Sequence, residues 1–161
     1  MKKRFQFFTT FVLIVVLAAG LLPTAAFAAV SGPDVTGSAA YVYCATTDEV
    51  LWQKNASKQY NLASITKLMT CLIAAEKLDL SEEVTVTQAA TEVIKTESFV
   101  FAGEKIKAED LMYAALLASA NDAAKALAIT ASGSEKKFVK LMNQKAKELG
   151  CKNTNFVTSS G

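Results

Sequence analysis

The 161-residue sequence contains no histidine and only three cysteines, Cys44, Cys71 and Cys151. The absence of histidine excludes His-based catalytic triads and most zinc sites, so any catalysis must rest on Ser, Lys, Cys or carboxylate side chains. The cysteines are odd in number and have no Cys-x-x-Cys spacing, which argues against a disulfide scaffold. We interpret them as small apolar residues, with one disulfide plus a free thiol as the alternative, and predict neither a metal nor a cofactor.

The sequence also lacks an apolar run of the ~18 residues that a membrane-spanning helix needs. Its one extended apolar run, residues 11–22, follows three basic residues at positions 2–4 and precedes the triplet Ala26-Phe27-Ala28. This order predicts a secretory signal peptide over residues 1–28. We therefore expect an exported protein that acts outside the cytoplasm, in the cell wall or the periplasm.

A large excess of either charge is absent too. Without residues 1–28 the chain keeps fourteen Lys and fifteen Asp plus Glu, so its net charge is close to zero. Such a balance gives no reason to expect a nucleic-acid partner. The remaining residues 29–161 have the length of one domain and can bury a hydrophobic core.

The first part of this domain mixes strand and helix signals. Residues 39–55 contain two β-rich runs around the turn-forming Thr46-Thr47-Asp48, which is typical of a hairpin, and residues 84–86 are a short strand candidate. A helix of about fourteen residues is expected to start at or just before Ser64. The apolar residues that indicate it are Ile65, Leu68, Met69, Leu72 and Ile73.

The second part is rich in helix signals, which makes the predicted fold class α+β. Two helices should meet at residues 118–122, and a last helix should begin after Ser134 as its N-cap and end at Gly150. The first two apolar stripes are Leu111, Ala114, Ala115 and Leu117, then Ala123, Ala124, Leu127 and Ala128. The stripe of the last helix is Phe138, Val139, Met142, Ala146 and Leu149.

One Ser-x-x-Lys motif has surroundings that suit catalysis. Ser64 and Lys67 lie one helical turn apart within an otherwise apolar stretch, so the lysine should stack against the serine. Free N–H groups at a helix N-terminus could also stabilise an oxyanion there. A second Ser-x-x-Lys sequence, Ser134 to Lys137, lies in a run of charged residues. There Ser134 is explained as an N-cap and Lys137 as a solvated lysine. The first motif is therefore a candidate nucleophile and base, with polar surface residues as the alternative.

Catalysis by Lys67 would require a lowered pKa. A lysine with the ordinary pKa of ~10.4 is only about 0.04% neutral at pH 7. Burial or a second cation nearby can lower that pKa. The apolar flanks of Lys67 favour burial, whereas no second cation is identifiable in the sequence.

A second candidate lies at the predicted break between two helices. Ser119 and Asn121 are two residues apart in Ser-Ala-Asn, so a hydroxyl and a carboxamide can project from the turn into the same space. The alternative is that Ser119, Asn121 or Asp122 caps the following helix. We assign Asp122 to capping alone.

These motifs and their surroundings resemble the D-alanyl-D-alanine carboxypeptidases, the low-molecular-mass penicillin-binding proteins of the serine β-lactamase-like superfamily. The stretch "LASITKLMT" resembles their nucleophile motif, and "GEKIKAEDLMYAALLASANDAAKALA" resembles the surroundings of their Ser-x-Asn motif. The stretches "FVKLMNQKAKELG" and "KNTNF" resemble the helix and turn that follow. Two ordered motifs in matching surroundings are far more specific than either motif alone.

The resemblance implies a mechanism residue by residue. Ser64 would attack the terminal D-Ala-D-Ala bond of peptidoglycan stem peptides, with Lys67 as the base, and the resulting acyl-enzyme would be released by water. Ser119 would relay a proton to the leaving D-alanine, and Asn121 would bind the substrate backbone. The Ser64 N–H would form half of the oxyanion hole. The implied ligands are stem peptides and β-lactam antibiotics.

The chain departs from the family pattern in one large respect. The third family motif, Lys-Thr-Gly on a sheet strand, has no counterpart among the 161 residues. We therefore expect the N-terminal part of a serine β-lactamase/transpeptidase-like fold, without the C-terminal sheet strands or any C-terminal membrane anchor. The alternatives are an inert truncated product and a class A β-lactamase, although Ala120 stands where the latter usually has Asp.

The signal peptide gives the first testable prediction. Cleavage should occur after Ala28, because small residues at positions 26 and 28 fit the Ala-x-Ala preference of the processing site. N-terminal sequencing of the exported protein should begin at Ala29. A retained Met1 would contradict the prediction.

Overall fold

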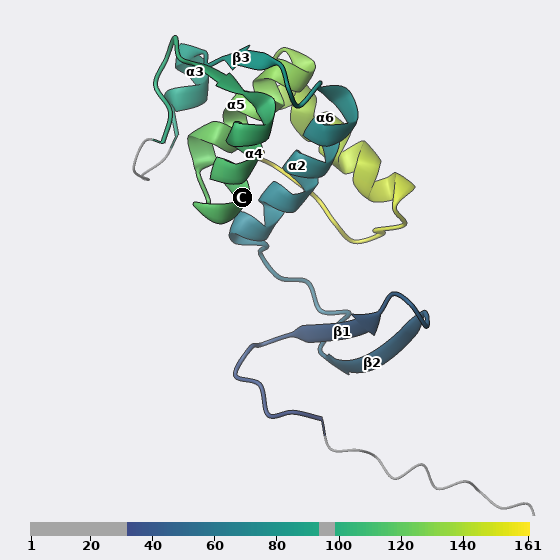
Figure 1. The fold of residues 1–161 in the computed structure, drawn as a ribbon. Coiled ribbons are helices and arrows are strands. Elements are labelled where there is room, and N and C mark those ends of the chain that lie inside the picture. The colour runs from purple at the N-terminus through teal and green to yellow at the C-terminus, as the bar shows by residue number, and fades with distance from the viewer. Residues whose placement is uncertain (1–31, 94–98) are drawn as a thin grey trace, which may run out of the picture. The chain divides into compact units, whose positions relative to one another are not determined.

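The structure is a computed structural model that describes residues 32–93 and 99–161. The predicted signal peptide over residues 1–28 lies outside the described residues. The chain divides after Ala56 into an N-terminal unit and a C-terminal unit, each with its own secondary structure (Figure 1).

The N-terminal unit contains the predicted hairpin. Strands β1 (Ala40–Cys44) and β2 (Glu49–Lys54) pair antiparallel, with a register irregularity between Val42 and Tyr43. The turn between them places Asp48 in the left-handed region at φ 58°, which Asp tolerates better than most residues. The hairpin carries exposed apolar side chains on Tyr41, Val42, Tyr43, Val50 and Leu51.

The C-terminal unit is mainly helical. It begins with the short 3-10 helix η1 (Ala63–Ile65), which leads directly into α2 (Thr66–Lys77). Strands β3 (Glu83–Thr85) and β4 (Lys105–Lys107) form a second antiparallel pair, which includes the predicted strand near residues 84–86. The remaining helices are α3 (Gln88–Thr91), α4 (Ala108–Leu117), α5 (Asn121–Ser132) and α6 (Glu135–Glu148).

Helix α5 lies at the centre of this unit and packs against α2, α3, α4 and α6 (Figure 1). Three of its alanines, Ala123, Ala124 and Ala128, are fully buried, so neighbouring helices can approach its backbone closely. One buried cluster joins α5 to α2, α4 and the β3–β4 pair. A second cluster, around Phe138 and Met142, joins it to α2 and α6. The predicted stripe of α5 is therefore confirmed.

Most of the apolar residues that indicate α2 in the sequence are not the residues that the helix buries. Ile65 and Leu68 are 63% and 62% exposed, and Leu72 is also exposed. The face that packs against α5 contains smaller or polar residues instead, namely Thr66, Lys67, Thr70, Cys71 and Ala74, together with Ile73. Because α5 offers an alanine-rich surface, small side chains on α2 allow the two helices to come close.

The other helices follow the predictions except near their ends. Leu111 and Ala115 of α4 and Phe138, Met142 and Ala146 of α6 are buried, whereas Leu117 and Leu149 are exposed where their helices end.

Both predicted ends of α6 are confirmed. The Ser134 hydroxyl accepts a hydrogen bond from the Lys137 N–H at 3.3 Å, as expected of an N-cap. At the other end Gly150 has φ 79°, and the N–H groups of Gly150 and Cys151 bond to the carbonyls of Lys147 and Ala146. These two bonds form a Schellman motif, which favours glycine because of its positive φ.

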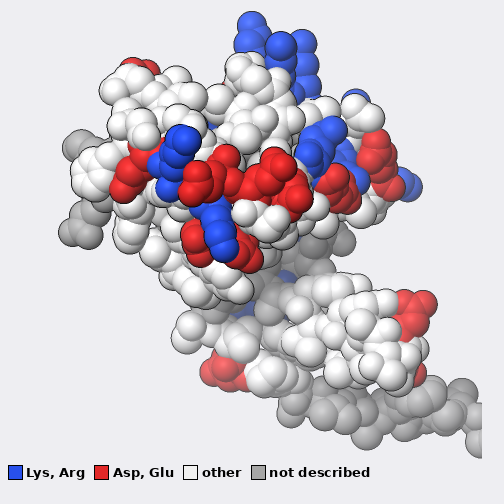
Figure 2. Space-filling model, turned by 45° about the horizontal axis from the view of Figure 1, so that its top comes forward, with Lys and Arg blue, Asp and Glu red and all other residues white. Residues whose placement is uncertain are grey.

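Acidic and basic side chains alternate over the face shown in Figure 2. Neither sign forms an extended patch on that face, which agrees with the near balance of the composition. Within residues 32–93 and 99–161, no helix is both long enough and apolar enough to span a bilayer.

The N-cap of α6 can be tested by its stability effect. Ser134→Ala should lower the free energy of unfolding by about 1 kcal/mol, because the first turn of α6 loses a hydrogen-bond acceptor. Ser134→Asp should retain the stability because a carboxylate also caps. Urea unfolding followed by circular dichroism measures both, and an alanine variant as stable as the original chain would refute the cap.

Candidate active site

Ser64 lies at the entrance to α2, on an unusual piece of backbone. It occupies the middle of the 3-10 turn η1, directly after Ala63, which has a positive φ of 47°. The predicted helix start is confirmed, with the α-helix itself beginning at Thr66. This turn leaves Ser64 exposed while the helix carries Lys67 into the interior.

The amine of Lys67 is the most unusual group in the structure. The side chain is only 1% exposed, although lysine side chains are rarely buried. Its Nζ lies 3.0 Å from Ser64 Oγ, 3.3 Å from Ser119 Oγ and 3.1 Å from the carbonyl oxygen of Ser160. The two serine hydroxyls are themselves 2.9 Å apart. Three of the four predicted site residues thus converge on one point.

Ser119 reaches this point because of the break between α4 and α5. Helix α4 ends at Leu117, and Ser119 adopts a left-handed conformation with φ 57°. The N–H groups of Ala118 and Ala120 both bond to the Ala114 carbonyl, which fixes the turn on either side of Ser119. A non-glycine residue in this region costs free energy, so the fold holds the Ser119 hydroxyl beside Lys67 against a local strain.

Asn121 begins α5 two residues after Ser119. Among the hydrogen bonds of the described residues, none joins its side chain to Ser64, Lys67 or Ser119. The alternative in which Ser119 or Asn121 caps α5 is wrong, because the N-cap is Ala120 and no side chain bonds there as a cap.

The prediction that Asp122 caps α5 is wrong, because the N-cap is Ala120 and Asp122 is already the second residue of the helix. Its carboxylate is fully buried, and Oδ1 accepts a hydrogen bond from the Ala123 N–H in the first turn of α5. Its Oδ2 accepts from the N–H groups of Phe99 and Val100, at 2.7 and 3.2 Å. Asp122 therefore ties the chain before β4 to the start of α5.

Burial changes the acidity of two neighbouring groups on α2. Removal from water lowers the pKa of Lys67, which a weaker Coulombic interaction with Cys71 opposes. Burial also raises the pKa of the Cys71 thiol to about 11, which a weaker interaction with Lys67 opposes. A lowered lysine pKa increases the neutral fraction that can accept a proton. Lys67 is therefore buried, as its apolar flanks in the sequence favoured. Burial alone accounts for the direction in which its pKa shifts, without a second cation.

One contact of Lys67 was not predicted. Ser160 comes from the segment after α6, which returns to the N-terminal end of α2 (Figure 1). The contact spans 93 positions and uses a backbone carbonyl, so no residue pattern in the sequence could indicate it.

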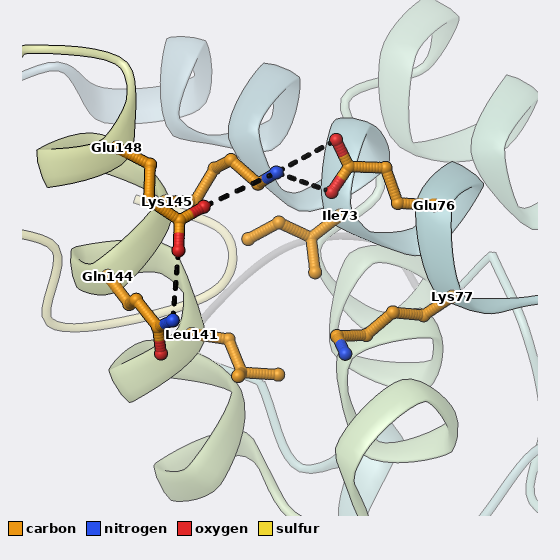
Figure 3. A pocket seen from close by; sticks show the side chains of 7 residues that line it. All are labelled: Ile73, Glu76, Lys77, Leu141, Gln144, Lys145 and Glu148. Atoms are coloured by element: carbon orange, nitrogen blue, oxygen red, sulfur yellow. Dashed lines mark hydrogen bonds and ion pairs between the residues drawn. The ribbon is translucent and has the colours of Figure 1, made fainter.

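A cleft between α2 and α6 lies away from this cluster and is bridged by an ion pair, since Lys145 of α6 contacts Glu76 of α2 at 2.7 Å (Figure 3). Lys145 also contacts Glu148 at 3.6 Å, on its own side of the cleft. Its volume of about 140 Å³ is below the range of roughly 300–1,000 Å³ that is usual for ligand sites. In the described part of the chain, no three His, Cys, Asp or Glu side chains are grouped to hold a metal ion.

The strain at Ser119 predicts a difference between two variants. Ser119→Gly should be more stable than Ser119→Ala by about 1 kcal/mol, because glycine adopts the left-handed region without the steric cost. Both variants lack the hydroxyl, so the comparison isolates the backbone. Equal unfolding free energies in urea would show that the position is not strained.

The lowered pKa of Lys67 predicts how stability depends on pH. Below its lowered pKa the buried ammonium costs free energy, and this cost disappears as the pH rises through the lowered pKa towards the ordinary value of 10.5. Cys71 acts in the opposite direction between pH 9.0 and about 11, because its folded pKa is raised. In a Cys71→Ala background, stability should therefore increase with pH.

Lys67→Met in the same background should remove this increase and should be at least as stable at pH 7. Urea unfolding between pH 7 and 10.5 is the measurement. A rise that persists in the methionine variant would assign the pH dependence to another group.

Comparison with known proteins places these residues in a family. The model of the D-alanyl-D-alanine carboxypeptidase family matches residues 26–161. The chain is 40% identical over 120 residues to the D-alanyl-D-alanine carboxypeptidase DacF of Bacillus subtilis, and the match covers 71% of this chain and 31% of DacF. It is 35% identical over 140 residues to the D-alanyl-D-alanine endopeptidase of Escherichia coli, covering 86% and 45% of the two chains.

A solved structure gives the same result. The D-alanyl-D-alanine carboxypeptidase DacD from Francisella tularensis superposes with a TM-score of 0.76 at 28% identity, over 89% of this chain and 36% of that one. The chain thus spans between about a third and a half of the length of these relatives. Its α+β fold is that of the penicillin-binding proteins and serine transpeptidases, as predicted. On the match to nearly all of the residues after position 25, the chain belongs to the D-alanyl-D-alanine carboxypeptidase family.

Proposed function

We propose that Ser64 is the nucleophile of a serine-type D-alanyl-D-alanine carboxypeptidase that trims peptidoglycan stem peptides. Ser64 Oγ would form an ester with the carbonyl carbon of the penultimate D-alanine as the bond to the terminal D-alanine nitrogen breaks. The Ser64 proton would pass to Lys67 and, through Ser119, to the leaving amine. Water would then hydrolyse the ester and restore Ser64.

The observation that carries this proposal is the buried amine of Lys67 at 3.0 Å from Ser64 Oγ. Structural lysines rarely bury their amine without a carboxylate partner. The acceptors around Lys67 are two hydroxyls and a carbonyl, none of which carries charge. Such surroundings favour the neutral amine, which is the form that a general base requires.

Hydrogen counting is compatible with Ser64 as the nucleophile. A neutral amine has two N–H donors and one lone pair. The Ser160 carbonyl can only accept, so it takes one N–H, and Ser119 Oγ can take the other. Ser119 can donate its own proton to Ser64 Oγ, 2.9 Å away. The lone pair then remains for the Ser64 hydroxyl, and every donor in the cluster has an acceptor.

The same arrangement gives Ser119 its proposed role. Ser119 Oγ contacts both Lys67 and Ser64, so it can relay the proton between the base and the leaving group. Asn121, at the start of α5, is proposed to bind the substrate backbone, and the Ser64 N–H is proposed as half of the oxyanion hole. These chemical steps need no cofactor.

The proposal includes the location and the ligands of the protein. Residues 1–28 would direct export, so the enzyme would meet peptidoglycan outside the cytoplasm. β-Lactam antibiotics, whose strained amide imitates the D-Ala-D-Ala bond, would acylate the same serine. The proposal includes no nucleic-acid partner, and it includes a membrane only through a C-terminal anchor.

A second candidate reaction is endopeptidase cleavage, because one of the relatives is named a D-alanyl-D-alanine endopeptidase. Both reactions would use the same acyl-enzyme and would differ in which bond the substrate presents. Release of free D-alanine from a peptide that ends in D-Ala-D-Ala distinguishes the carboxypeptidase from the endopeptidase.

The proposal can be tested in a hybrid chain in which residues 29–161 are continued by the C-terminal portion of Bacillus subtilis DacF. A fluorescent penicillin should label this hybrid chain covalently. Ser64→Ala should abolish the label, and Lys67→Ala should slow its formation about 100-fold or more, because the general base is lost. Labelling is measured as in-gel fluorescence over time.

Ser134→Ala provides the matched control, since Ser134 belongs to the other Ser-x-x-Lys sequence and only caps α6. It should leave the labelling rate unchanged, and residues 29–161 alone should remain unlabelled without a Lys-Thr-Gly strand. Label that persists on Ser64→Ala would move the nucleophile to another residue.

A further inference from the structure

The segment that follows α6 supplies one of the three acceptors of Lys67. We name residues 156–160 the C-terminal strap. The carbonyl of Ser160 in the strap accepts from Lys67 Nζ at 3.1 Å. A carbonyl cannot donate, so its position determines where one N–H of the amine points and therefore where the lone pair is left.

The strap is held by an acidic residue of α6 that touches neither Ser64 nor Lys67. Glu135 Oε1 accepts from the Ser159 N–H at 3.0 Å and from the Ser159 hydroxyl at 2.7 Å. On its other side, the Ser159 carbonyl accepts from Thr70 Oγ1 at 2.6 Å. Ser159 is fully buried, so each of these bonds replaces a contact that water could otherwise make.

We propose that Glu135 is a positioning residue for Lys67. By holding Ser159, Glu135 places the neighbouring Ser160 carbonyl against the amine and keeps the strap closed over it. This inference rests on the proposed function of Lys67 as the general base. It extends the active site to α6, which supplies none of the three groups that contact the amine.

The charge of Glu135 does not explain its proposed effect on Lys67. Its other oxygen, Oε2, lies 3.9 Å from Lys125 of α5, and both side chains are partly exposed, so this ion pair is weak. The titratable group that interacts with Lys67 is Cys71 of α2. The break before α5 and the strap contribute only uncharged groups, the Ser119 hydroxyl and the Ser160 carbonyl. Glu135 therefore acts through the strap.

Three variants distinguish the effect of holding the strap from the effect of the negative charge of Glu135. Glu135→Ala removes the acceptor and opens the strap to water. Glu135→Gln removes the charge and the ion pair with Lys125 but keeps an oxygen that can accept from Ser159. Glu148→Ala, at the other end of α6, removes a carboxylate that contacts Lys145 and Gln144 and not the strap.

The first readout is the titration of Lys67 in the hybrid chain. It is followed by NMR of 13Cε-labelled lysine, with the Lys67 signal assigned from Lys67→Arg. Because burial is the main cause of the lowered pKa of Lys67, Glu135→Ala should move its midpoint up towards the ordinary value. Glu135→Gln and Glu148→Ala should titrate as the unsubstituted chain does. If Glu135 contributed only to stability, the Lys67 midpoint would be the same in all three variants.

The second readout is penicillin labelling of the hybrid chain. At pH 7 Glu135→Ala should label about tenfold more slowly, since each pH unit of raised pKa reduces the neutral fraction tenfold. Its pH profile should move to higher pH by the same amount as the titration midpoint, and Glu135→Gln should restore both. If Glu135→Ala does not fold, Ser159→Ala replaces it, because it removes only the hydroxyl bond and should shift the midpoint less but in the same direction.

The outcomes distinguish this inference from the proposed function. A midpoint that moves in Glu135→Ala or Ser159→Ala and not in Glu135→Gln supports the positioning role, even if Ser64 takes no label. Labelling of Ser64 with equal Lys67 midpoints in all variants would overturn the positioning role and leave the proposed function standing. An equal shift in Glu135→Gln and Glu135→Ala would also overturn it, because charge and not the strap would then be responsible.

Discussion

The burial of one amine without a carboxylate partner is the constraint on which the site depends. Lys67 gives up contact with water and receives only neutral oxygens in return, so its charged form is disfavoured in the folded chain. A folded protein retains such a group at a cost in stability. The cost is understandable if the neutral amine is useful, and the adjacent, exposed hydroxyl of Ser64 is the group that could use it.

Three separate parts of the C-terminal unit are needed to enclose this amine. The turn η1 supplies Ser64, the break between α4 and α5 supplies Ser119, and the strap after α6 supplies the Ser160 carbonyl. The alanine-rich α5 allows α2, α4 and α6 to pack close together around it. Positive φ values at Ala63 and Ser119 show that the backbone is strained at two of these three places. Local strain beside reactive groups is a common property of functional sites.

Local sequence patterns predicted the elements better than their contacts. The hairpin, the start of the helix at Ser64, the break at Ser119 and both ends of α6 each follow from a few neighbouring residues, and the structure contains them. The buried face of α2 does not follow from periodicity, which singles out Ile65 and Leu68, whereas the alanine surface of α5 selects a face of small residues and a lysine. Only the tertiary partner decides between two faces of a helix that both carry apolar residues.

The parts of the site that sequence reasoning missed are long-range or use the backbone. Ser160 contributes a carbonyl, which any residue possesses, and Glu135 acts through a serine 24 positions away. Asp122 was interpreted as a cap from its position near the start of a helix, and its bonds to N–H groups 22 and 23 positions earlier in the chain could not be seen there. The nucleophile and the base could be found because their chemistry requires particular side chains at one-turn spacing.

The structure leaves two serines within hydrogen-bonding distance of the same lysine, so the central claim is the choice of Ser64 over Ser119. The most direct measurement is peptide mass spectrometry of the penicillin-treated hybrid chain after digestion with trypsin. Cleavage at lysines places Ser64 in the peptide of residues 59–67 and Ser119 in that of residues 108–125. The account predicts the mass of one opened penicillin on the first peptide and none on the second. An adduct on residues 108–125, or no adduct on residues 59–67, would contradict it.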